Sequence, residues 1–258
     1  MDEGLRVTFL GTGTSQGIPV IGSDHEVCLS KDPRDKRLRT SVLLSWKDFN
    51  YVIDCGPDFR QQMLAHDVSK LNGILFTHEH ADHTAGIDDI RPFFFRQGDI
   101  PIYADQRVIS SLKQRFDYIF AGADRYPGAP AVEVRLIRER SPFTLGDSVV
   151  VPIEAWHNRL PVLGYRVKDF TYLTDVKSVT SEETEKIKGS KVLVINALRK
   201  EPHHSHFNLE QALDFAKKIQ AGKTYLTHIS HLLGFHEEVE KNLPKDVHLA
   251  YDNLTIHL

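Results

Sequence analysis

The stretch ILFTHEHADHTAG, residues 74–86, decides the fold of this chain. An apolar run, typical of a buried strand, leads directly into three histidines and an aspartate: His78, His80, Asp82 and His83. Alternating histidines could also mark an exposed strand, but that interpretation does not explain the adjacent Asp82 and His83. Imidazole and carboxylate groups are preferred ligands of zinc and similar divalent metals. The stretch therefore predicts a metal site at the end of a strand.

Three further residues of the same chemical types stand at the ends of later predicted strands. His157 follows EAW, Asp175 follows YLT, and His228 follows a second YLT. Any one of them alone would be an ordinary core, turn or surface residue. Because strand ends can meet at one edge of a sheet, all seven residues together are enough for two metals that share a bridging ligand. Two metals about 3.5–4 Å apart can activate a water and hold a phosphoryl or carbonyl oxygen.

Short apolar runs alternate with amphipathic stretches along the chain. We expect strands at 6–10, 41–46, 51–55, 73–78, 101–104, 132–137, 148–156, 170–175, 191–197, 224–228 and 247–252, and helices at 59–67, 82–95, 106–120, 181–188, 208–220 and 235–242. WKDFN, residues 46–50, predicts a hairpin turn. Asn208 is the expected N-cap of the helix over 208–220. No linker divides the sequence, so we expect one domain over 1–258, with two sheets and flanking helices.

The composition limits the partners and the compartment. The chain has 258 residues and a formal net charge of −3, so it has no overall electrostatic attraction to nucleic acid or membranes. No run approaches the roughly 18 apolar residues of a membrane span. The opening MDEGLRVTFLGTG lacks the basic and apolar regions of a secretory signal. The two cysteines, Cys28 and Cys55, fit a reducing compartment, and we expect a cytoplasmic protein.

The motif HEHADH at 78–83 resembles the H-x-H-x-D-H motif of the metallo-β-lactamase superfamily. YVIDCG at 51–56 is similar to the strand motif that precedes it, and the later ligand-type residues follow in the matching order. This resemblance covers nearly the whole chain. It implies an α/β fold, an αββα sandwich of two mixed sheets flanked by helices, with a dinuclear site at one edge of the sheets.

The resemblance also implies roles for individual residues. The implied ligands are His78, His80 and His157 for one metal, Asp82, His83 and His228 for the other, and Asp175 as the bridge. Asp82 is implied to be catalytic as well as a ligand. Asp54 is implied to orient ligands by hydrogen bonds; its alternative is a carboxylate that caps the turn before Gly56. The expected cofactors are two divalent ions, zinc or manganese, with iron also suited to these ligands.

Three stretches resemble the phosphodiesterase branch of the superfamily, which includes tRNA 3′-processing endonucleases and phosphoribosyl cyclic phosphodiesterases. FLGTGTSQGIP at 9–19 resembles the opening of that branch, and such a loop can offer backbone N–H groups to an anion. HHSHFNLEQAL at 203–213 places His206 where the branch has a histidine, and LTHISH at 226–231 resembles its final ligand motif. We therefore expect a phosphodiester hydrolase in which His206 protonates or stabilises the departing oxygen. Its expected substrate is a small cyclic phosphodiester, such as phosphoribosyl 1,2-cyclic phosphate or a related nucleotide.

Other activities stay open. The tRNA-processing enzymes carry a long arm between the third histidine motif and the bridging aspartate, and residues 158–174 leave no room for one. The basic run KDPRDKRLR at 31–39 either contacts phosphates or is a solvated loop. A lactone, thioester or β-lactam hydrolase would leave His206 unused, and a non-catalytic metal-binding protein would leave the full ligand set unexplained. A homodimer is a further expectation.

A second metal site is suggested by IGSDHEVCLS, residues 21–30. Cyclic phosphodiesterases of this branch have C-x-C-x-x-C here, which joins the second histidine of the LTHISH-type motif in a structural zinc site. In this chain the first two cysteine positions read Ser23 and His25. The remaining candidate ligands are His25, Cys28 and His231, with Asp24 as a fourth. Either a structural zinc persists, or the loop is a relic in which Cys28 is a small buried residue.

Overall fold

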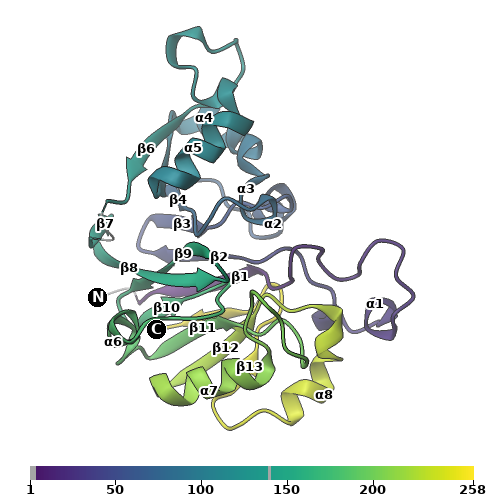
Figure 1. Ribbon diagram of the computed structural model, residues 1–258. Helices are drawn as coiled ribbons and strands as arrows, with labels where there is room; N and C mark the ends of the chain where they lie inside the picture. The colour runs from purple at the N-terminus through teal and green to yellow at the C-terminus, as the bar shows by residue number, and fades with distance from the viewer. Residues whose placement is uncertain (1–3, 139–140) are drawn as a thin grey trace.

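Two mixed β-sheets form the centre of the computed structural model, which describes residues 4–138 and 141–258 (Figure 1). The first sheet has the order β14-β1-β2-β3-β4-β5-β6 and the second the order β13-β12-β11-β10-β9-β8-β7. The strands of the first sheet are β1 (Arg6–Gly11), β2 (Ser41–Trp46), β3 (Phe49–Ile53), β4 (Gly73–Leu75), β5 (Ile100–Ala104), β6 (Val132–Leu136) and β14 (Thr255–His257). Those of the second are β7 (Phe143–Leu145), β8 (Ser148–His157), β9 (Leu160–Val167), β10 (Phe170–Tyr172), β11 (Val192–Asn196), β12 (Lys223–Thr227) and β13 (Val247–Leu249).

The two sheets pack face to face because their strands alternate apolar side chains between two faces. In β2, Val42 and Leu44 belong to the core between the sheets, whereas Leu43 points to the outer core of the first sheet. Tyr165 and Tyr172 of the second sheet are fully buried in the same central core. Each sheet is therefore apolar on both faces, and each outer face needs a cover of helices.

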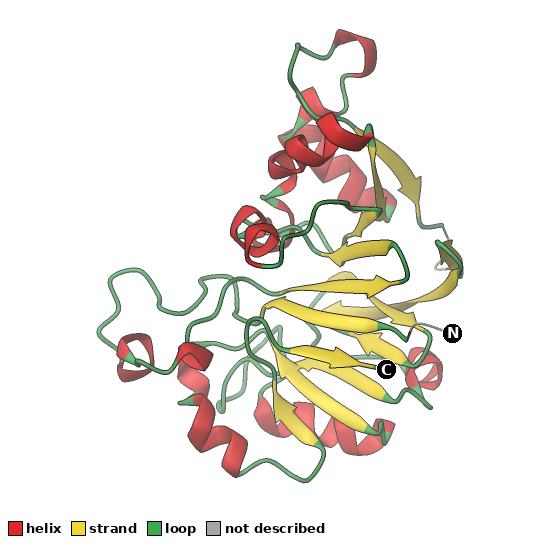
Figure 2. Cartoon of the chain, turned by 180° about the vertical axis from the view of Figure 1, so that it is seen from behind, coloured by secondary structure: helices red, strands yellow, loops and turns green. Residues whose placement is uncertain are grey.

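Helices lie on both outer sides of the sandwich, as the view from behind shows (Figure 2). The first sheet is followed or covered by α2 (Phe59–Ala65), α3 (Ala81–Thr84), α4 (Arg91–Gln97) and α5 (Gln106–Arg115), and the second by α6 (Ser181–Ile187), α7 (Leu209–Ile219) and α8 (His236–Lys241). The short helix α1 (Glu26–Leu29) stands away from the sheets on the long segment between β1 and β2 (Figure 1). The predicted αββα sandwich is confirmed.

Two local predictions are confirmed in detail. The hairpin at 46–50 pairs Trp46 with Phe49. Asn208 caps α7: its side chain accepts a hydrogen bond from the Gln211 amide, and the Gln211 side chain accepts one from the Asn208 amide. The cap starts α7 directly after the loop that carries His206, so it fixes the direction in which that loop enters the helix.

The single helix predicted over 82–95 is wrong. The chain forms α3, a short 3₁₀ turn over Ile87–Ile90, and then α4. Gly86 packs against the Gly56 loop so closely that a Cβ atom there would lie 2.0 Å from the Gly56 carbonyl oxygen. Pro92 has no backbone N–H and fits only the first turn of a helix, where α4 begins.

Several strand and helix limits also differ from the prediction. The chain adds β7, β9 and β14, which the alternation pattern did not predict, and the helix expected over 106–120 ends at Arg115. The predicted strands over 73–78 and 170–175 end as strands at Leu75 and Tyr172, and their polar ends become the loops of the site. No helix among the described residues is long and apolar enough to cross a bilayer.

Candidate metal centre

The seven predicted ligands meet at one edge of the sandwich, on segments that follow β4, β10 and β12 and at the end of β8. Three groups share members, and within each group the ligand atoms lie within 4.8 Å of one another. The groups are His78, His83 and Asp175; Asp82, His83 and His228; and His157, Asp175 and His206. His80 joins them through its ring, whose centroid is 4.5 Å from that of His78 and 5.3 Å from that of His157. The chain therefore gathers all seven side chains.

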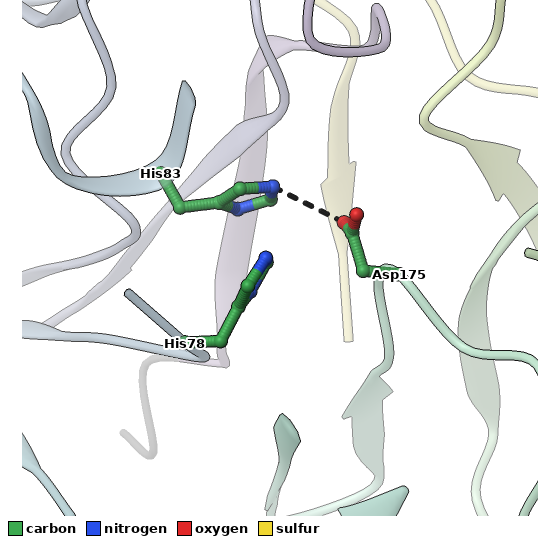
Figure 3. A group of neighbouring side chains, drawn as sticks. All are labelled: His78, His83 and Asp175. Carbon is green, nitrogen blue, oxygen red and sulfur yellow. Dashed lines mark ion pairs between the residues drawn. The ribbon is translucent and has the colours of Figure 1, made fainter. Parts of the chain in front are cut away.

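Asp175 lies between the side chains implied for one metal and those implied for the other. Its Oδ2 is 3.1 Å from His83 Nε2 and 3.3 Å from His228 Nε2 on one side. On the other side its carboxylate lies within 4.8 Å of ring nitrogens of His78 and His157. Figure 3 shows the first of these contacts and the His78 ring pointing to the same space. Asp82 Oδ2 lies 3.2 Å from His83 Nε2, on the half of the cluster that contains His228. This placement fits the bridging position expected for Asp175.

Backbone turns in the left-handed region aim these side chains. The φ angles are 65° at Asp54, 59° at Asp175 and 54° at His228, each shortly after a strand. Such conformations are unfavourable for residues other than glycine and occur where the surrounding structure holds them. The Asn196 side chain holds the Asp175 turn, because its Oδ1 accepts from the Val176 amide (2.7 Å) and its Nδ2 donates to the Val176 carbonyl (3.1 Å).

Asp54 and Thr77 fix the orientation of two histidines. The Asp54 carboxylate is fully buried, accepts from the Thr77 amide and hydroxyl (both 2.8 Å), and lies 2.7 Å from His83 Nδ1. Because the Thr77 hydroxyl donates to Asp54, it accepts from His78 Nδ1 at 3.0 Å. Asp54 therefore contacts the His83 ring directly and the His78 ring through Thr77, which are the contacts that the predicted orienting role requires.

These bonds set the tautomer that a histidine needs in order to bind a metal. Protons on Nδ1 of His78 and His83 leave the Nε2 lone pairs free, and Nδ1 of His157 likewise donates to the Asp175 carbonyl at 3.0 Å. Among the described residues, Nε2 of His78, His83 and His228 is buried and has no hydrogen-bond partner. Buried polar atoms are normally satisfied, so these three nitrogens fit a bound cation.

The charges of the cluster also fit a bound cation. Burial lowers the pKa of His78 well below its usual range, which favours the neutral, lone-pair form. Burial raises the pKa of Asp175, but His228 and His83 outweigh it and hold that pKa well below its usual range. Burial also acts against a charged His83, yet the surrounding carboxylates, led by Asp82, hold its pKa well above its usual range. The acidic cluster therefore needs positive charge, which either a proton on His83 or a divalent metal can supply.

His206 lies beside the cluster and outside the seven ligands. Its ring is 4.5 Å from that of His157 and 4.9 Å from that of His228, and its Nδ1 is 3.7 Å from Asp175 Oδ1. Burial lowers the pKa of His206 to about 2, although Asp175 opposes this shift. His206 is therefore neutral at pH 7 and can present an N–H group to a substrate.

Several amides of the loop over 9–19, whose composition suggested an anion site, are used in hydrogen bonds within the protein. The amides of Gly13, Thr14 and Gly17 donate to the carbonyls of Leu38, Ile229 and Thr14, respectively. The Thr12 carbonyl accepts from the Ile229 amide at 2.9 Å. The loop therefore supports the segment that carries His228, and these three amides are not available to an anion.

The expected structural zinc site finds little support in the geometry. The rings of His25 and His231 are 4.9 Å apart, but the groups of three metal-type atoms within 4.8 Å of one another do not include them. Cys28 is 3% exposed, packs with Ile18 and Val27, and accepts a hydrogen bond from the Val20 amide at 3.4 Å. Packing accounts for Cys28, and a structural zinc here stays a prediction.

Sequence reasoning missed Thr77 and Asn196, which orient the site without facing it. Asn196 is a single amide at the end of KVLVINA, an otherwise apolar strand, and its full burial requires hydrogen-bond partners. That isolated polar residue was the available signal. Thr77 stands beside His78 and offered no comparable signal.

Comparison with known proteins supports the resemblance. The family model described as a beta-lactamase superfamily domain matches residues 49–229, which is more than half of the chain. A solved structure of "a new diphosphatase from the PhnP family" superposes with a TM-score of 0.92 and 37% identity, over 98% of both chains.

Two curated relatives carry different names. An octanoyltransferase of Porphyromonas gingivalis is 39% identical over 97% of this chain but only 51% of its own length. A ribonuclease Z of Methanococcus maripaludis is 29% identical over 36% of this chain and 26% of its own. The chain thus spans about half the length of the first relative. The diphosphatase and the ribonuclease are hydrolases, as predicted for this chain, and by the family match the chain belongs to the metallo-β-lactamase superfamily.

Proposed function

We propose that this chain is a metal-dependent hydrolase of small phosphodiesters, with cyclic phosphates and diphosphate diesters as its candidate substrates. The observation that carries the proposal is the position of His206 next to a seven-residue cluster. In that cluster, Nε2 of His78, His83 and His228 is buried without a hydrogen-bond partner. The similarity to a PhnP-family diphosphatase over nearly the full length adds support.

The chain's own residues supply ligand atoms, orientation and a hydrogen-bond donor. A pair of divalent ions, when bound, would lower the pKa of a water and place positive charge near phosphoryl oxygens. The seven side chains would hold these ions, with Asp175 between them and Asp54 and Thr77 keeping the imidazoles aligned. His206 would donate its N–H to the oxygen that departs, where negative charge develops in the transition state.

Two competing functions are less well supported. Residues 158–174 hold only the β8–β9 turn, β9, β10 and the short approach to Asp175, so this segment carries no RNA-gripping arm. The name octanoyltransferase belongs to a protein about twice as long as this chain. An acyl thioester is therefore included in the test.

A substrate panel tests the proposal. Protein loaded with Zn²⁺ or Mn²⁺ is offered thymidine 5′-(p-nitrophenyl phosphate), di(thymidine 5′) diphosphate, a ribose 1,2-cyclic phosphate, a short RNA, an octanoyl thioester, a lactone and a β-lactam. We expect turnover of the small phosphate esters, and its loss after chelation. Faster turnover of the thioester, lactone or β-lactam than of every phosphate ester would overturn the proposal.

A further inference from the structure

Two histidines next to His206 have no role in the site described so far. His203 and His204 lie on the loop between β11 and α7, and we call them the histidine rim. The His203 ring is 5.1 Å from that of His206 and 4.3 Å from that of His204, so the three rings form a row that leads outward from the cluster. His204 is exposed and His203 half-buried.

The loop that carries the histidine rim is tied down at its base. The Leu198 amide donates to the Phe207 carbonyl at 3.0 Å, and the Phe207 amide donates to the Val176 carbonyl at 2.7 Å. The Asn208 side chain donates to the Lys200 carbonyl at 2.9 Å. The rim is therefore held at a fixed place beside the turn that follows Asp175.

The bonding of His203 leaves a donor for a ligand. Its Nδ1 accepts from the Ser205 amide at 3.3 Å, so in the neutral ring the proton is on Nε2. Among residues 4–138 and 141–258, no side chain or carbonyl accepts a hydrogen bond from that Nε2, and it is not one of the buried atoms that lack a partner. The N–H group thus faces accessible space.

The surroundings of His203 are positively charged. Burial lowers the pKa of His203, and the neighbouring His204, Arg199, His157 and Lys177 lower it further. Of these neighbours, Arg199 and Lys177 are cations at neutral pH. A region with this potential and an open N–H donor favours an anionic group of the substrate.

We propose that His203 and His204 bind the phosphoryl group that departs with the leaving half of the substrate, which makes diphosphate diesters the preferred class. This inference rests on the proposed function. Water attacks one phosphorus, the bond from that phosphorus to the bridging oxygen breaks, and its electron pair stays on the departing phosphate. The products are two monophosphates and one proton. A departing phosphate needs charge stabilisation more than it needs a proton, and N–H donors beside His206 supply it.

The test compares two substrates with the same transferred thymidylyl group. Di(thymidine 5′) diphosphate has a phosphate in its leaving group, and thymidine 5′-(p-nitrophenyl phosphate) does not. We measure the ratio of their kcat/KM values for the wild type and for His203→Leu, His204→Leu and the double variant. A lost hydrogen bond to a charged group lowers this diphosphate preference by about 10- to 100-fold in the double variant.

Control variants separate binding from packing. His203→Gln keeps an N–H donor near the position of Nε2 and should restore part of the ratio, whereas leucine fills the space without a donor. His257→Leu, an exposed histidine on β14, should leave both rates and the ratio unchanged. Metal content is measured for every variant, so that loss of metal is not mistaken for loss of the rim.

The outcomes distinguish two failures. If metal-loaded wild type cleaves no phosphate ester of the panel, the proposed function fails and this inference fails with it. If it cleaves the cyclic phosphate but not the diphosphate diester, this inference alone is overturned. If wild type cleaves both and the leucine variants keep the wild-type ratio, the assignment of His203 and His204 is overturned while the hydrolase stands. An equal loss in His203→Leu and His203→Gln would also overturn it, because donor chemistry would then not matter.

Discussion

Asp175→Asn should lower kcat/KM on phosphodiesters by more than about 1,000-fold, because it removes the charge that both halves of the site share. The Asp175 carboxylate lies 3.1 Å from His83 Nε2, implied for one metal, and within 4.8 Å of a ring nitrogen of His78, implied for the other. An amide has nearly the same shape but is neutral, and its NH₂ group would repel a cation where the carboxylate attracts one. Activity and metal content, measured on the same sample, check this expectation.

A matched control exists in the same sheet. Asp169 is a partly exposed residue between β9 and β10, and its carboxylate is 2.8 Å from Lys191 Nζ. Asp169→Asn should therefore leave turnover and metal content at wild-type values, since exposed ion pairs contribute little. Full activity and full metal content in Asp175→Asn would remove Asp175 from the ligand set and contradict the arrangement proposed here.

His206→Ala should lower kcat on phosphodiesters with alkoxide leaving groups by about 10²–10³-fold, while metal content stays at the wild-type value. His206 lies beside the cluster and its loss removes an N–H donor, but the seven other side chains keep their contacts. The measurement is single-turnover and steady-state kinetics on substrates that share one transferred group.

A comparison of leaving groups shows whether His206 assists the departing oxygen. A p-nitrophenolate needs little stabilisation, so the loss should be much smaller on p-nitrophenyl esters than on alkyl esters. An equal loss on both would mean that His206 binds the phosphoryl group that is attacked and does not assist departure. An exposed histidine, His257, supplies the control substitution to alanine, which should change neither rate.

The sequence was sufficient to predict the gathering of the seven side chains, because strand ends leave little freedom. His157, Asp175 and His228 are each preceded by a short apolar run, and such runs become strands whose ends meet at one edge of the sandwich. The capped start of α7 was predictable for a similar reason, since Asn208 and Gln211 have the spacing of a capping box.

Other features depend on contacts between distant segments and were not visible in local patterns. The helix expected over 82–95 breaks because Gly86 must pack on the Gly56 loop, which is far away in the sequence. The edge strand β14 pairs with β1 across nearly the whole chain. The orientation of His83 by Asp54, and of His78 by Thr77, also depends on such contacts, because it requires the Asp54 carboxylate that follows β3.

Titration of metal-free protein with Zn²⁺ or Mn²⁺ tests the central claim most directly, with bound metal and turnover of thymidine 5′-(p-nitrophenyl phosphate) followed together. The seven-ligand cluster predicts that activity is absent without metal, rises with added ion, and levels off at about two ions per chain. Full turnover by metal-free protein, or saturation with no bound metal, would contradict a dinuclear hydrolase.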